Sequence, residues 1–196
     1  NSTFVSGLKL GSNSNRHYQT MDDMLGGTIF HNINTYAVGD YPITDPRVQY
    51  DLNTAGPNMT GKLVYEGDKF GYDYNIRSYL AKAWIQNQIN TMHWDVNYGL
   101  EMSYTNFMRH GNMQNGRATE NSLGSGKRHT FDNAAFKAGA TYKLNGRDYF
   151  AAHFAYGTRA PLPDYAYVSP RIKDTSVTGL KSERFLSADI AYIWNY

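Results

Sequence analysis

The chain has 196 residues and no cysteine. This length corresponds to one domain, and the composition excludes disulfides and thiolate metal sites. The formal net charge is only +2, which argues against a large basic footprint on nucleic acid. Tyrosine is abundant, at 17 residues, yet the mean hydropathy is −0.60. No apolar run approaches the ~20 residues that a membrane-spanning helix needs.

Six segments alternate between apolar and polar residues, which is the pattern of a β-strand whose two faces meet different surroundings. The clearest example is 93–108, where Trp94 and Tyr104 share the apolar face and Asp95 and Glu101 share the opposite one. The predicted strands, in chain order, are 3–11, 70–89, 93–108, 134–144, 149–158 and 185–196.

One predicted strand, 70–89, is irregular. Leu80 and Trp84 interrupt its alternation. We attribute this either to a β-bulge or to a strand that extends beyond the apolar layer that the other strands cross.

Short and long connections alternate along the chain. Asn145-Gly146 is a strong hairpin signal, and Asn90-Thr91-Met92 makes a second short turn. The long connections, rich in Asn, Gly, Asp and Ser, span about 12–69, 109–133 and 159–184. Long loops at one end and short turns at the other are typical of outer-membrane β-barrels.

The apolar face of 93–108 is about ten residues long, enough for a tilted strand to cross a bilayer core. Trp and Tyr favour the two water–lipid interfaces. The predicted lipid-facing aromatic girdle consists of Trp94, Tyr98, Tyr104, Tyr142, Phe150, Tyr156, Tyr192 and Trp194.

The predicted fold is therefore all-β: an antiparallel, up-and-down transmembrane β-barrel segment of about six strands, with residues 1–196 in one barrel domain. The smallest membrane barrels have eight strands, so either partner chains supply the remaining strands or the chain is a fragment of a larger barrel. We expect the fragment.

Charged residues on the opposite parity are expected to face the barrel interior. A buried charge needs a partner, so these side chains imply either pairing to a plug or a polar substrate path. They are Arg77, Lys82, Asp95, Glu101, Lys137, Lys143 and Asp189.

The sequence contains no pattern that predicts catalysis. Gly124–Arg128 resembles a phosphate loop only faintly, because it lacks the first glycine and has Arg128 where Ser or Thr should bind magnesium. The six histidines show no metal-ligand spacing. We therefore predict no enzyme activity, no metal site and no cofactor.

The segment Tyr156-Gly157-Thr158-Arg159-Ala160-Pro161, followed by Leu180-Lys181-Ser182-Glu183, resembles TonB-dependent outer-membrane receptors. Segment 136–145 resembles the strand that precedes this motif in the family, and segments 21–27 and 70–74 resemble loop and strand segments of its carboxypeptidase-regulatory-like branch. Ser182 replaces the usual proline of the motif, and Asp189 stands where Glu is common. The motif positions that carry the resemblance are Arg159, Ala160, Pro161, Leu180, Lys181 and Glu183.

The resemblance implies a 22-stranded barrel in the outer membrane of a Gram-negative bacterium, surrounding a plug that is absent from this sequence. Such receptors import scarce nutrients with energy from the TonB complex, which they contact through the plug. The implied partners are outer-membrane lipid, the TonB complex, a small-molecule or oligomeric nutrient and, in some receptors, a surface lipoprotein. The ligand stays open among siderophores, glycans, vitamins and peptides.

Five loop side chains are candidates for ligand binding, because aromatic rings stack on flat ligands and polar groups orient them. They are Tyr36, Tyr41, Tyr65, Arg117 and Tyr165.

Two other classes remain open. A passive porin or adhesin-like barrel shares the strand pattern. A soluble β-sandwich carbohydrate-binding module would also expose Tyr and Trp, and would fold without detergent.

Overall fold

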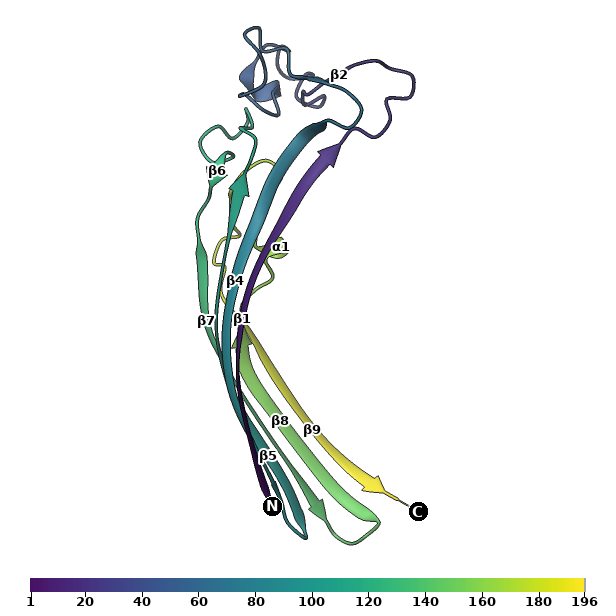
Figure 1. The fold of residues 1–196 in the computed structure, drawn as a ribbon, viewed down its shortest axis with the longest axis vertical. Coiled ribbons are helices and arrows are strands. Elements are labelled where there is room, and N and C mark those ends of the chain that lie inside the picture. Colours follow the sequence, from purple (N-terminus) through teal and green to yellow (C-terminus); the bar gives the residue numbers. More distant parts are fainter. Residues whose placement is uncertain (196) are drawn as a thin grey trace.

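The computed structural model describes residues 1–195, and its main unit is one antiparallel sheet (Figure 1). The long strands lie side by side in chain order. They are β1 (Ser2–Thr20), β4 (Lys69–Asn90), β5 (Trp94–Gly111), β7 (His129–Lys143), β8 (Asp148–Arg159) and β9 (Glu183–Trp194). The prediction of an all-β chain with an antiparallel sheet is confirmed.

The smaller elements lie in the long connections. A short strand, β6 (Gly124–Ser125), pairs with β5, and β2 (Phe30–His31) pairs with β3 (Leu63–Val64) in a separate two-stranded sheet. The helical elements are η1, a 3-10 helix at Pro46–Val48, and α1 at Pro163–Ala166. Within residues 1–195 there is no helix with the length and apolar composition to cross a membrane.

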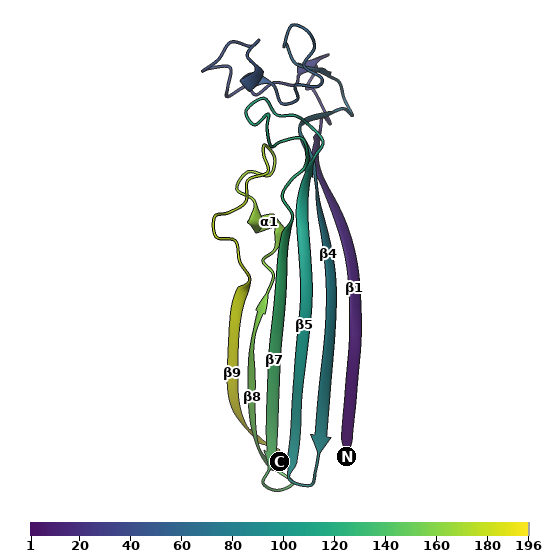
Figure 2. The same cartoon turned by 90° about the vertical axis from the view of Figure 1, so that its left-hand side faces the viewer.

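The main sheet is open. Its edge strands are β1 and β9, which lie on opposite sides in Figure 2 and do not pair with each other. The described residues therefore form a curved sheet and not a closed barrel.

Several strands are longer than their alternation indicated. β1 continues to Thr20, past residue 11, and β7 begins at His129, ahead of residue 134. In β1 the added residues include Ser12 to Asn15, which are polar on both faces and pair with Ile76 to Tyr79 of β4. Alternation gives no signal where both faces are polar, so only the pairing with β4 defines this part of the strand.

The two faces of the sheet can be told apart by what packs on them. Figure 1 shows α1 on the concave side of the curved sheet. Ala166 of α1 and the adjacent Tyr167 pack against Tyr74, Phe107 and Phe131 in the hydrophobic core. These strand side chains therefore belong to the concave face. Residues of the opposite parity, including Trp94 and Tyr104 of β5, belong to the convex face.

The irregularity in 70–89 has a different cause from the predicted bulge. Pairing between β4 and β5 runs without interruption from Tyr74 to Asn90, so Leu80 and Trp84 lie on the concave face. The register shift of this strand falls between Tyr18 and Gln19 of β1, beside Gly71, whose φ is +73°.

The prediction that Arg77 faces the interior together with Lys82 is wrong. Arg77 pairs with Met108 of β5, a convex-face position, because 77 and 82 differ in parity along an unbroken strand.

Candidate functional site

The convex face is a continuous apolar surface. Leu100 of β5 lies between Ile85 of β4 and Phe136 of β7, and the same row continues through Tyr156 and Leu186. Above and below this row lie further exposed apolar side chains. They are Phe4, Leu8, Leu10, Met102, Phe154 and Ile190. Monomeric soluble proteins rarely expose a contiguous apolar patch of this extent.

Aromatic rings border this surface near the short turns. The ring centroids of Trp94 and Tyr142 are 4.8 Å apart, and those of Phe150 and Tyr192 are 5.1 Å apart. Tyr142 pairs with Phe150 across β7 and β8, so the four rings form one row. The polar tip of one of them is hydrogen-bonded, since the Tyr192 hydroxyl donates to Asp148.

A second row lies toward the long loops. It contains Tyr104 of β5 and Tyr79 of β4, which is the cross-strand partner of Asn106, two residues along β5 from Tyr104. Tyr104 follows Trp94 by ten residues, which corresponds to about 34 Å along a strand and about 24 Å across a layer at a tilt near 45°. The apolar band of membrane barrels is about 25 Å tall.

All eight residues of the predicted aromatic girdle share the convex face. Tyr98 and Tyr156 lie inside the apolar band, which is the part of the convex face between the two aromatic rows, and not in either row. The Tyr98 hydroxyl accepts a hydrogen bond of 3.0 Å from the Asn87 amide, and Ser2 donates to Asn87 Oδ1 at 3.0 Å. These polar groups inside the apolar band are therefore paired with one another, as a low-dielectric surrounding requires.

The concave face carries charge in cross-strand pairs. Lys82 Nζ lies 2.7 Å from Glu101 Oε1, and Lys143 Nζ lies 2.6 Å from Asp95 Oδ1. Four of the predicted interior charges are thus paired with each other within the sheet. Lys137 and Asp189 share this face, and within residues 1–195 neither forms an ion pair.

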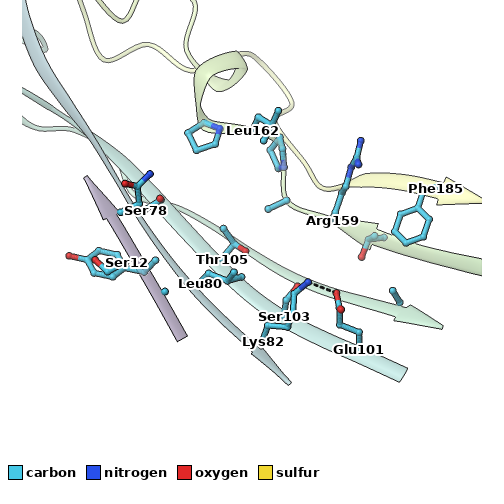
Figure 3. Close-up of a pocket in the computed structure, with 18 residues that line it drawn as sticks. Ser12, Ser78, Leu80, Lys82, Glu101, Ser103, Thr105, Arg159, Leu162 and Phe185 are labelled. Atoms are coloured by element: carbon cyan, nitrogen blue, oxygen red, sulfur yellow. Dashed lines mark ion pairs between the residues drawn. The ribbon is translucent and has the colours of Figure 1, made fainter. Parts of the chain in front are cut away.

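A cavity of about 560 Å³ lies on the concave face between the sheet and the connection that contains α1. Figure 3 shows Lys82 and Glu101 on the strand side and Leu162 on the side of the connection. The motif residues Arg159, Ala160 and Pro161 line this cavity.

The motif shapes the path of the chain between β8 and β9. Arg159 Nε lies 2.8 Å from Glu183 Oε2, which joins the two strand ends. Ala160 and Leu180 pack against the hydrophobic core. Lys181 is exposed. These contacts return the connection onto the concave face.

The three long connections meet at one end of the sheet, opposite the short turns (Figures 1 and 2). Arg109, near the end of β5, joins two of them and is only 2% exposed. Its Nε donates to the Pro170 carbonyl at 2.7 Å, and its Nη1 donates to the Ser122 carbonyl at 2.8 Å. Burial lowers the pKa of Arg109 from its ordinary value, and the charge of Asp174 opposes that shift.

The first long connection is tied to the second by two hydrogen bonds from backbone N–H groups of the second. Gly116 N donates to the Gln49 carbonyl at 3.0 Å, and Gln114 N donates to Asp51 Oδ1 at 3.1 Å. Gln49 and Asp51 are buried, so the two connections form one packed cluster.

Three of the five predicted ligand-binding residues lie together in this cluster. Tyr36, Tyr41 and Arg117 line a cavity of about 390 Å³, and Tyr36 and Arg117 also line a neighbouring cavity of about 410 Å³. Tyr65 and Tyr165 are exposed and line neither cavity.

Several residues that line these two cavities were not among those predicted from the sequence. Tyr50, Tyr72 and Arg171 line the larger one, and Arg47 lines the smaller one. Their approach depends on contacts between distant connections, and no local pattern in the sequence signals it. Among the described residues there is no group of three or more His, Asp or Glu side chains placed to hold a metal ion.

Comparisons with known proteins identify no family. No protein-family model matches the chain, and no curated protein or solved structure is significantly similar to it.

Proposed function

We propose that the chain is a β-barrel segment of an outer-membrane TonB-dependent receptor that takes up a scarce nutrient. The observation that carries this proposal is the convex apolar band between two aromatic rows, with paired charges on the opposite face. An apolar face about 24 Å tall, bordered by Trp and Tyr, matches the lipid-facing surface of a membrane barrel.

A membrane also accounts for what covers the convex face. A sandwich would require a second sheet packed on this face. Within residues 1–195 the other sheet is the small β2–β3 pair, which lies among the loops. Lipid is therefore the proposed neighbour of Leu100, Met102 and Phe136.

The open edges fit the same proposal. Lipid provides no hydrogen-bond partners, so a sheet in a membrane must close. Further strands that pair with β1 and β9 would complete the barrel, with the concave face lining its interior and contacting a plug. By the resemblance, that plug would connect the barrel to the TonB complex.

Two substitutions in neighbouring positions test the membrane surface. Met102 is 62% exposed on the convex face, whereas Ser103 lies on the concave face beside Lys82. In a membrane, M102R should reduce the free energy of unfolding by about 1–3 kcal/mol, because Met102 lies between the middle of the band and its border at Tyr104, and S103R should change it much less. In a soluble sheet M102R would be nearly neutral. Unfolding of the full-length protein in phospholipid vesicles measures the difference, and a neutral M102R contradicts the proposal.

Ion conductance separates a receptor from a passive porin. In a planar bilayer, a barrel filled by a plug should pass no steady current, and mild denaturant that unfolds the plug should open it. A steady current through the untreated full-length protein would instead support the porin.

A further inference from the structure

We infer that the cavity of about 410 Å³ among the loops binds a small ligand that carries an oxyanion beside a flat or ring-shaped apolar part. This inference rests on the proposed function, because it assigns the chemistry of a ligand to the loop end of the barrel. The oxyanion can be a carboxylate, a sulfate or a phosphate.

The charge of the cavity wall selects an anion. Arg117 and Arg171 both line this cavity, and no Asp or Glu does. Both side chains are exposed, and within residues 1–195 neither guanidinium forms an ion pair or donates a hydrogen bond. Two unpaired guanidinium groups present planar sets of donors that suit an oxyanion.

The smaller neighbouring cavity provides a contrast. Its Arg47 is already engaged, because Arg47 Nη2 lies 2.7 Å from Asp45 Oδ2 and the guanidinium lies 3.7 Å from the Tyr41 ring centroid. The hydrogen bonds from Arg47 lower the pKa of Asp45 to about 2. Asp40 also lines that cavity. Charge therefore favours the larger cavity as the anion site.

Rings and amides supply the rest of the recognition surface. Tyr36, Tyr50 and Tyr72 line the larger cavity with Asn34 and Asn115. The Arg171 guanidinium lies 4.8 Å from the Tyr72 ring centroid. This cation–π contact restrains the guanidinium of Arg171, and its N–H groups stay available for hydrogen bonds. Ring faces suit a flat or ring-shaped ligand part, and amides suit its polar substituents.

Buried contacts hold the two arginines in place. The Arg117 backbone N–H donates to Asn115 Oδ1 at 3.0 Å, and Asn115 N donates to Ser122 Oγ at 2.9 Å. Arg109 binds the carbonyls of both Ser122 and Pro170, and Pro170 precedes Arg171. Arg109 is thus a positioning residue that fixes the two cationic segments relative to each other.

Binding of four fluorescent probes to the full-length protein in zwitterionic detergent tests the inference. The probes are the phosphate, sulfate, glucuronide and glucoside of 4-methylumbelliferone, of which the glucoside is the neutral counterpart of the glucuronide. At least one anionic probe should bind tenfold or more tightly than the glucoside. R117Q and R171Q should each weaken that binding about tenfold or more, because each removes charge-assisted hydrogen bonds.

R128Q is the matched control, since Arg128 lies at the same end of the sheet but lines neither cavity. The preferred probe among phosphate, sulfate and glucuronide identifies the oxyanion. If no anionic probe bound more tightly than the glucoside, or if R128Q weakened binding as much as R117Q and R171Q, the inference would be overturned. That result would leave the membrane proposal intact, because M102R tests the convex face and not the loops.

Discussion

The indole of Trp84 occupies the space where a side chain at Gly7 would lie. A Cβ atom built on Gly7 would be 2.2 Å from Cζ2 of Trp84, and the two residues are direct partners across β1 and β4. A large ring on one strand thus covers the bare backbone of its neighbour, a known way to stabilise a glycine in a sheet.

This contact predicts that G7A is destabilising. The added methyl group must displace the indole, at a cost of about 1–3 kcal/mol in the free energy of unfolding. G11A is the matched control on the same strand and face, because its nearest neighbour, Leu80 Cβ, would lie 3.8 Å away. Urea unfolding followed by tryptophan fluorescence measures both variants. Equal stabilities for G7A and G11A would contradict the contact.

Replacing Arg109 should loosen the loop cluster and leave the sheet intact. R109M removes the donors to the buried carbonyls of Pro170 and Ser122, each worth about 1–3 kcal/mol when left unpaired. Limited proteolysis should then cut within 112–123 and 160–182 much faster than in the original chain, while the strands stay protected. R128M, which changes an exposed arginine, should leave the cleavage pattern as it is. Unchanged cleavage in R109M would show that Arg109 does not hold these segments.

Asp73 should contribute to stability in a pH-dependent way. Burial raises its pKa, but hydrogen bonds from Arg16 and Asn112 outweigh burial, so the pKa of Asp73 lies below its ordinary value. A lowered carboxyl pKa stabilises the fold above the ordinary value near 4, and this contribution is lost as the pH falls through the folded-state value.

The free energy of unfolding should therefore fall less in D73N than in the original chain between about pH 6 and pH 2. D40N is the control, because Asp40 is exposed and forms no ion pair within residues 1–195. A pH dependence in D73N as steep as that of D40N would rule out this role for Asp73.

Alternation predicted the faces of the sheet where the two faces differ in polarity. Around Trp94, Leu100 and Tyr142 an apolar residue at every second position was sufficient, because a strand has a strict period of two. The same rule could have placed Arg77 correctly, since its parity matches that of Tyr79. Arg77 was predicted to face the interior because it is charged, although its place in the alternation indicated the convex face.

The other differences depend on contacts between segments distant in sequence. Trp84 interrupts the alternation because it covers Gly7 on another strand, and sequence alone does not reveal that partner. Arg117 could be selected as a polar loop residue, but its proximity to Arg171 follows from the buried Arg109. Loop residues meet through such tertiary hydrogen bonds, and these have no period along the chain.

The orientation of the sheet in a membrane is the central claim, and two tryptophans report on it directly. Trp94 lies on the convex face and Trp84 on the concave face. Both variants also carry W194F. In one of them W84F leaves Trp94 as the tryptophan of this chain, and in the other W94F leaves Trp84. The measurement is fluorescence quenching of the full-length protein, compared between the two variants, in bilayers of phospholipid brominated on its acyl chains. If lipid covers the convex face, Trp94 should be strongly quenched and Trp84 only slightly. Equal quenching of the two, or none of Trp94, would contradict this orientation.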